Sequence, residues 1–344
     1  MTKQPELFEV FWTEKEQVIM ANRNIFLVVL LGMLVPAMTS ESDEVQPSCM
    51  RLDYPSQRLE GLRVSWFGAA SVVIDDGEHS VLIDPFVSRE ENTLFGIATG
   101  KIAKINYNAI YRRLRRPEIS RAQVIFVGHS HYDHSLDVAD FAKCLQVPVF
   151  RSADTSRIVK AHDYTEVKEF DPRLVLQNFR INGGFTVTAL KSKHARPPAC
   201  LASVCFDPLK KKVPDHFEFP AAIRDYGRGY VFTFYVEHKF GNVLHIGTAG
   251  IVPEFLKHID GDVDVLMLAL AGRNKRYLGE VLSIVKPRFV IPIHYDNLFK
   301  SIDEGVRVTR LAKLENFLKY MESEYPMIET RRISFDDPWI LPNR

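Results

Sequence analysis

The sequence His-Ser-His-Tyr-Asp-His at positions 129–134 constrains this chain more than any other segment. It directly follows an apolar, β-type run at 124–128, so we expect the histidines where a buried strand ends. Alternation along the chain puts His129 and His131 on one side of the turn, while Asp133 and His134 reach back from the start of the next element. Imidazole nitrogens and carboxylate oxygens are ligands that a borderline cation such as Zn²⁺ prefers.

The type of ligand also bears on the type of site. A structural zinc site would more often use cysteine and close its coordination sphere, whereas too few His and Asp ligands to close it leave a position open to water. The alternative interpretation is a chance group of histidines on a solvated loop. The preceding strand, the spacing and the later His194 and His294 favour a metal site instead.

The motif resembles the signature of the metallo-β-lactamase superfamily, and four further stretches extend the resemblance over roughly residues 60–300, in the right order. These stretches are the hairpin-like residues 62–85, the turn at 192–194, the His-Ile-Gly-Thr-Ala-Gly turn at 245–250 and the His-bearing strand end at 291–296. The chain most resembles the branch with ascorbate-6-phosphate lactonase and the phospholipase D that hydrolyses N-acylphosphatidylethanolamine. The resemblance implies an α+β fold, a four-layer αβ/βα metallo-β-lactamase sandwich.

By the same resemblance, the predicted ligands divide into two sets. His129, His131 and His194 would hold one metal ion, and Asp133, His134 and His294 would hold the second. The implied cofactor is Zn²⁺, as one or two ions, with Mn²⁺ or Fe²⁺ as alternatives. Asp133 is also the candidate catalytic residue, because a carboxylate that does not bind metal fully can orient or deprotonate water.

The sequence departs from the superfamily at Thr248, where the bridging Asp is expected. A shared carboxylate offsets the repulsion between two dications, so its loss is expected to weaken the second site most. The chain would then hold one tight metal ion, or two with water filling the gap. A decayed, non-catalytic relic is disfavoured, because all five histidine ligands are retained. His245 is either a further ligand or a hydrogen-bonded strand histidine.

Four residues near the predicted ligands are candidates for substrate binding. Tyr132 and Tyr295 adjoin ligands and are expected to line the mouth of the site. Arg196 and Arg273 are candidates for holding an anionic substrate, with surface salt bridges as the alternative role of both arginines.

These features predict a metal-dependent hydrolase in which metal-activated water attacks an ester-type bond, preferably a phosphodiester or a lactone. We expect a small-molecule or lipid-like substrate. The net charge of +1 and the lack of a basic, aromatic strip in the sequence argue against a nucleic-acid partner, and so against a nuclease. The alternative from a different class is a non-catalytic metal-binding accessory or sensor protein with the same fold.

The N-terminal part predicts export. Residues 25–38 are apolar, follow Arg23 and precede small and polar residues, a pattern too short for a comfortable membrane span and typical of a signal-peptide core. We assign residues 1–58 to a leader (signal peptide or anchor) and a polar linker, and residues 59–344 to one hydrolase domain. The expected location is periplasmic or secreted; the alternative is membrane anchoring through the uncleaved leader. Either Met1 or Met20 is the start.

The cysteines and the apolar periodicity predict further features of the structure. Cys200 and Cys205 either pair across a short loop, in an oxidising compartment, or stay as buried thiols; Cys144 lies in an apolar helical pattern, so packing is its predicted role. Strands are expected near 62–67, 71–75, 80–84, 124–127, 229–237, 243–246, 263–268 and 289–293, and helices near 105–116, 136–144 and 306–320.

Overall fold

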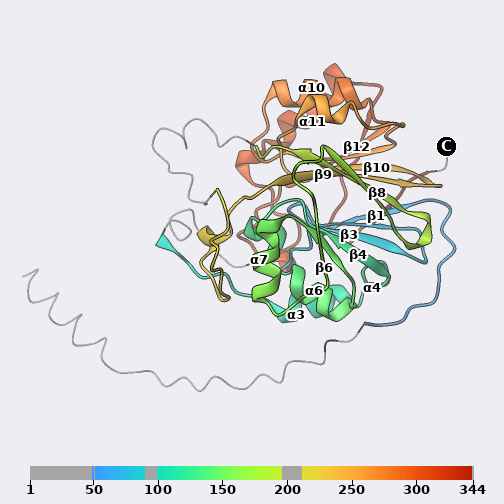
Figure 1. The fold of residues 1–344 in the computed structure, drawn as a ribbon. Helices are drawn as coiled ribbons and strands as arrows, with labels where there is room; N and C mark the ends of the chain where they lie inside the picture. Colours follow the sequence, from blue (N-terminus) through green and yellow to red (C-terminus); the bar gives the residue numbers. More distant parts are fainter. Residues whose placement is uncertain (1–48, 50, 90–98, 196–210, 343–344) are drawn as a thin grey trace, which may run out of the picture. The chain divides into compact units, whose positions relative to one another are not determined.

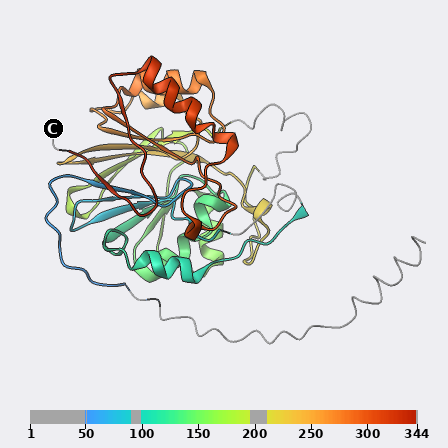
Figure 2. The ribbon, with the colours of Figure 1, turned by 180° about the vertical axis from the view of Figure 1, so that it is seen from behind.

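The computed structural model describes residues 49, 51–89, 99–195 and 211–342. They belong to one compact unit, residues 48–344, and form two seven-stranded sheets that lie face to face (Figure 1). Helices α3, α4, α6 and α7 cover the outer side of the first sheet, and α10 and α11 cover the second. The view from behind shows the same layers (Figure 2). The predicted α+β, four-layer sandwich is confirmed.

The first sheet has the strand order β14-β1-β2-β3-β4-β5-β6. β1 to β3 form an antiparallel meander, and β3 to β6 run parallel. The strands are β14 (Trp339–Ile340), β1 (Arg63–Trp66), β2 (Val72–Asp75), β3 (Ser80–Ile83), β4 (Ala122–Phe126), β5 (Val149–Arg151) and β6 (Val167–Glu169).

The second sheet has the order β13-β12-β11-β10-β9-β8-β7. β7 to β10 are antiparallel, and β10 to β13 are parallel. The strands are β13 (Glu329–Thr330), β12 (Phe289–Ile293), β11 (Val265–Ala269), β10 (Gly241–Ile246), β9 (Val231–His238), β8 (Thr186–Ser192) and β7 (Leu176–Arg180).

The helices connect these strands and begin with polar caps where the sequence provides them. Asn106 caps α3 and Asn274 caps α10, each accepting a hydrogen bond from a backbone N–H of the first turn. The helices are α3 (Tyr107–Leu114), α4 (Pro117–Ser120), α5 (Tyr132–Ser135), α6 (Val138–Leu145), α7 (Ala153–Ala161), α9 (Pro253–Leu256), α10 (Lys275–Val285) and α11 (Leu314–Glu324).

Aromatic side chains fill the space between the two sheets. The ring of Phe126 on β4 lies 5.4 Å from that of Phe234 on β9 and 5.9 Å from that of Phe179 on β7. Phe126 and Phe234 are fully buried. Burial of such large apolar surfaces between the sheets fixes how their strand ends face one another.

The predicted helix at 306–320 is wrong in its first half. α11 begins only at Leu314, because the preceding residues pair with the loop that follows β12. The N–H of Asn297 donates to the carbonyl of Arg307, and the N–H of Thr309 donates to that of Tyr295. Lys313 then adopts a left-handed φ of 45°, which separates this paired segment from α11. α10 was not predicted from the sequence.

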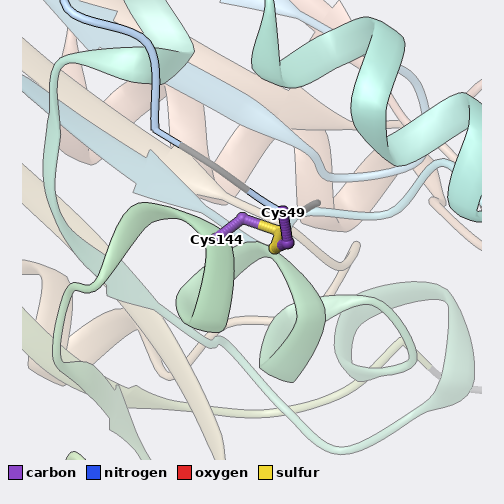
Figure 3. The surroundings of a disulfide bond; sticks show 2 residues. All are labelled: Cys49 and Cys144. Atoms are coloured by element: carbon purple, nitrogen blue, oxygen red, sulfur yellow. A yellow bond between two sulfur atoms is a disulfide. The ribbon is translucent and has the colours of Figure 1, made fainter. Parts of the chain in front are cut away.

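A disulfide joins Cys49 to Cys144 and ties the segment before β1 to α6 (Figure 3). The predicted role of Cys144 in packing is therefore incomplete, because this buried side chain is also covalently bonded. Arg51 donates to the carbonyl of Leu145, and the Ser120 hydroxyl donates to the carbonyl of Leu52. The last residues of the predicted linker thus lie against the helices of the first sheet.

Some expectations concern residues outside the described ranges, namely the apolar run at 25–38, Arg196, Cys200 and Cys205. Among the residues that are described, no helix is both long and apolar enough to cross a membrane.

Candidate metal centre

The candidate centre forms where strands of both sheets end. The His-rich motif follows β4 of the first sheet, whereas His194 follows β8 and His294 follows β12 of the second sheet. The N–H of Phe232, on β9, donates to the carbonyl of Gly128 over 2.8 Å. This bond fastens the motif turn of one sheet to the neighbouring strand of the other.

The first set of ligand atoms belongs to His129, His131 and His194, and these atoms lie within 4.8 Å of one another. The Nε2 atom of His129 lies 3.0 Å from the Nδ1 atom of His131. The Nδ1 atom of His194 donates to the carbonyl of Ala195 over 2.8 Å, which leaves its Nε2 atom as the ligand.

Burial keeps these three imidazoles neutral. It lowers the pKa of His129 and of His131 well below the ordinary value, and the neighbouring His134 and His194 lower these pKa values further. Burial also lowers the pKa of His194, to about 4. Neutral rings present lone pairs, and lone pairs on nitrogen are what a metal cation requires.

The second set comprises Asp133, His134 and His294, whose ligand atoms also lie within 4.8 Å of one another. The Nε2 atom of His294 lies 3.1 Å from the Oδ2 atom of Asp133, and that of His134 lies 3.8 Å away. Burial alone would raise the pKa of Asp133, but His134 and His294 outweigh it and hold that pKa well below its ordinary value. Asp133 is therefore a carboxylate.

Asp84 supports the second set through a contact with His134. From the sequence, Asp84 was predicted only as part of the opening hairpin. Its Oδ2 atom lies 2.8 Å from the Nδ1 atom of His134, and its Oδ1 atom accepts from the N–H of Gly128 over 2.6 Å. Burial would lower the pKa of His134, but Asp84 and Asp133 outweigh burial and raise it. A carboxylate on Nδ1 directs Nε2 toward the centre.

The turn that carries His294 has an unusual backbone. His294 has a φ of 51°, a region that non-glycine residues rarely adopt, and its N–H donates to the carbonyl of Ala69. The N–H of Ala69 donates in turn to the Asp296 carboxylate, which forms a buried ion pair with Arg89 at 2.6 Å. Such strain persists where the surroundings hold it in place, as this ion pair does.

The two sets of ligand atoms fit divalent metal cations. Each set gathers at least two imidazoles that are largely withdrawn from water, and the second adds an ionised carboxylate. Nitrogen and carboxylate donors of this kind suit Zn²⁺ and also Mn²⁺ or Fe²⁺. All six predicted ligands are brought together.

Thr248 stands where the bridging Asp is expected, and its side chain has a different function. The Oγ1 atom of Thr248 accepts a hydrogen bond from the N–H of Ala195 over 3.2 Å, so the hydroxyl braces the turn of His194. The Nε2 atom of His245 lies 2.9 Å from the carbonyl of Ala70, to which it donates, and burial lowers the pKa of His245. His245 is thus the hydrogen-bonded strand histidine of the two alternatives.

The residues predicted to bind substrate differ in their burial and contacts. The prediction for Tyr295 is wrong: its side chain is 1% exposed and packs on Trp66 with ring centroids 4.8 Å apart, in the core and not at a mouth. Arg273 donates to the backbone carbonyls of Ala312 and Lys313, so its guanidinium is engaged within the fold.

Tyr132 is buried and packs edge-on against Phe86. Its hydroxyl has no hydrogen-bond partner in the described part of the chain. It lines a small cavity together with Ser88, Leu136 and Phe299, and this cavity has about 10 Å³ for the centre of a water molecule, which is enough for about one water.

The fold and this site define a metal-dependent hydrolase. The chain belongs to the beta-lactamase superfamily, because the sequence model described as "Beta-lactamase superfamily domain" matches residues 63–294. A UPF0173 protein of Pyrococcus abyssi is 22% identical over 249 residues, which cover 72% of this chain and 89% of that protein. A UPF0173 metal-dependent hydrolase of Archaeoglobus fulgidus is 24% identical over 252 residues, which cover 73% and 90%.

Two solved structures show the same fold. One is a possible metal-dependent hydrolase from Veillonella parvula, with a TM-score of 0.53, 13% identity and coverage of 82% of this chain and 100% of that one. The other is CmlA, a diiron beta-hydroxylase from Streptomyces venezuelae, with a TM-score of 0.50, 14% identity and coverage of 82% and 55%. Because these proteins differ in described activity, the fold alone does not fix the reaction.

Proposed function

We propose that this metal-dependent hydrolase cleaves an ester-type bond, a phosphodiester or a lactone, in a small or lipid-like molecule. The observation that supports this proposal is the convergence of five histidines and one carboxylate from both sheets, His129, His131, Asp133, His134, His194 and His294. When bound, a divalent cation lowers the pKa of a coordinated water and polarises the electrophile. Ester hydrolysis by this route requires no nucleophilic side chain.

The residues of the chain have separate tasks in this proposal. The ionised carboxylate of Asp133 accepts a hydrogen bond from the attacking water and so orients it. Asp84 holds the Nδ1 proton of His134, so the Nε2 lone pair of His134 stays directed toward the centre. The buried pair of Arg89 and Asp296 fixes the loop that orients His294.

We propose Zn²⁺ as the resident metal, bound as one or two ions. The support is the donor set, in which nitrogen ligands predominate. Thr248 supplies no charge to offset a second cation, so the first set of ligands is expected to bind more tightly than the second.

The test is a pair of variants measured for metal content and for hydrolysis. Replacing His129 and His131 together by Ala is expected to remove most bound metal and all hydrolysis of lactones and phosphodiesters, with the circular dichroism spectrum retained. His258→Ala, at an exposed histidine, is the matched control and should change neither. Metal content that stays unchanged in the double variant would refute the site. Metal binding without hydrolysis of any ester would instead favour a metal-binding accessory or sensor protein.

We also propose that the protein is exported. The supports are the apolar run at 25–38 and the Cys49–Cys144 disulfide, since disulfides persist mainly in oxidising compartments. N-terminal sequencing of protein from its native host should then start between about Ala37 and Gln46. A mature chain that still contains residues 25–38 would contradict cleavage and favour a membrane anchor.

A further inference from the structure

The backbone of Arg228 lies directly beside the turn that carries the first ligands. Its carbonyl accepts a hydrogen bond from the N–H of Ser130 over 3.1 Å, and Ser130 is the residue between His129 and His131. Four residues later, the N–H of Phe232 donates to the carbonyl of Gly128. These two bonds hold Arg228 next to the metal centre although it is far from the motif in sequence.

The side chain of Arg228 is half-buried, and its guanidinium has no partner among the described residues. Within the described ranges, no hydrogen bond or ion pair engages its guanidinium, whereas the buried Arg89 and Arg151 each pair with a carboxylate. A partly desolvated, unpaired guanidinium is suited to bind an anion.

The described residues around Arg228 add positive charge. The N–H of the next residue, Gly229, donates to the carbonyl of Lys211, and Lys211 and Lys212 are both exposed. Lys193, beside the ligand His194, is exposed as well. Asp154 lies beside Gly229, so close that a Cβ atom at this glycine would meet its carboxylate. The Asp154 carboxylate is paired with Arg157 at 3.2 Å.

We infer that Arg228 binds an anionic group of the substrate, a carboxylate or a phosphate, beside the turn that carries His129 and His131. A planar guanidinium can grip either anion with two parallel hydrogen bonds, and so positions the scissile ester relative to the ligands. This inference rests on the proposed hydrolysis and narrows its substrates to esters that carry a second, anionic group.

The test compares esters that differ only in charge. A neutral aryl acetate, an aryl ester with a free carboxylate and an aryl ester with a phosphomonoester are hydrolysed by the metal-loaded enzyme and by its Arg228→Gln variant. The KM for the anionic esters, relative to that for the neutral ester, should rise roughly 10- to 100-fold in the variant, with a smaller change in kcat. Arg228→Lys should recover part of the difference. The carboxylate and phosphate arms show which anion is preferred.

Arg276→Gln is the matched control, since it removes the same charge from an exposed helix position and should leave every ratio unchanged. Equal losses for neutral and anionic esters in Arg228→Gln, or no loss for either, would overturn the inference while leaving the proposed hydrolysis intact.

A binding measurement separates the anion site from the proposed hydrolysis in the case that no ester is cleaved. Calorimetric titration of the metal-loaded protein with succinate and with inorganic phosphate should show binding that weakens roughly 10- to 100-fold in Arg228→Gln and stays unchanged in Arg276→Gln. If no ester is cleaved but this pattern holds, the anion site stands and the proposed function fails. Equal affinity in the wild type and Arg228→Gln would overturn the anion site.

Discussion

At the scale of single residues, Asp84 is the most informative side chain outside the ligands. Replacing it by Asn removes the negative charge that faces the Nδ1 atom of His134 while keeping the size and one acceptor oxygen. Loss of such a carboxylate typically weakens metal binding by about 10- to 100-fold, so we expect a drop of that order in Zn²⁺ affinity, measured by titrating metal-free protein. Asp171→Asn, at a partly exposed position between β6 and β7, should have no effect. An Asp84→Asn variant with wild-type affinity would refute this role.

Thr248 tests the missing bridging charge. Thr248→Asp keeps an acceptor for the N–H of Ala195 and adds a carboxylate near the ligands, so the metal stoichiometry should rise toward two per chain. Thr248→Asn has the same size without the charge and should leave the stoichiometry as it is. Elemental analysis of both variants beside the wild type decides the matter. Two equally tight sites in the wild type would show that the hydroxyl at this position is no handicap.

Asp137 gives the protein a stability that depends on pH. Burial raises the pKa of this carboxyl to about 6, although it accepts hydrogen bonds from the N–H groups of Val87 and Ser88. A group that holds its proton more tightly when folded stabilises the fold at low pH, so the contribution of Asp137 to the free energy of unfolding should fall by about 2–3 kcal/mol as the pH rises from about 4 to 6. Asp137→Asn should flatten this slope. Urea unfolding at several pH values checks it, and parallel curves for the two proteins would contradict it.

Four of the six ligands could be predicted because they lie in one short motif, and the resemblance to the superfamily indicated His194 and His294. Other site residues depend on strand pairing. Asp84 reaches His134 only because β3 lies parallel to β4, with Ile83 opposite Phe126. The position of Arg228 likewise depends on the contact between its segment and the motif turn. Tyr295 was misplaced for a related reason: the left-handed backbone at His294 is not visible in the sequence.

At the scale of elements, periodicity predicts strands better than the start of α11, since tertiary pairing at 307–309 overrides the helical pattern. Most predicted strands recur within one or two residues, because each combines a short apolar run with a turn signal. The Cys49–Cys144 pairing was not anticipated, because the two cysteines are 95 residues apart and only the packing of the N-terminal segment brings them together.

The disulfide makes the N-terminal segment part of the stability of the domain. It closes a loop with a sequence separation of 95 residues, and cross-links of this kind contribute about 2–4 kcal/mol, mainly by restricting the unfolded chain. Cys49→Ser should lower the free energy of unfolding by that amount, measured in urea, and leave metal content unchanged. Reducing agent should destabilise the wild type and not the variant. Equal stability of the two proteins under oxidising conditions would show that the bond contributes nothing.

At the scale of the whole molecule, the metal centre links the two sheets. Its ligands come from the end of β4 in the first sheet and from the ends of β8 and β12 in the second, so a bound cation cross-links elements that otherwise meet through apolar packing and backbone hydrogen bonds such as that from Phe232 to Gly128. Because the unfolded chain does not gather these ligands, metal binding should stabilise the fold by about 2.7 kcal/mol when free metal exceeds its Kd about 100-fold. Removing metal with a chelator should therefore lower the Tm, and adding Zn²⁺ should restore it. The variant with His129 and His131 both replaced by Ala should lose most of this response, whereas His258→Ala should keep all of it. A wild type whose Tm is the same with and without chelator would mean that the two sheets are held together without help from the site between them.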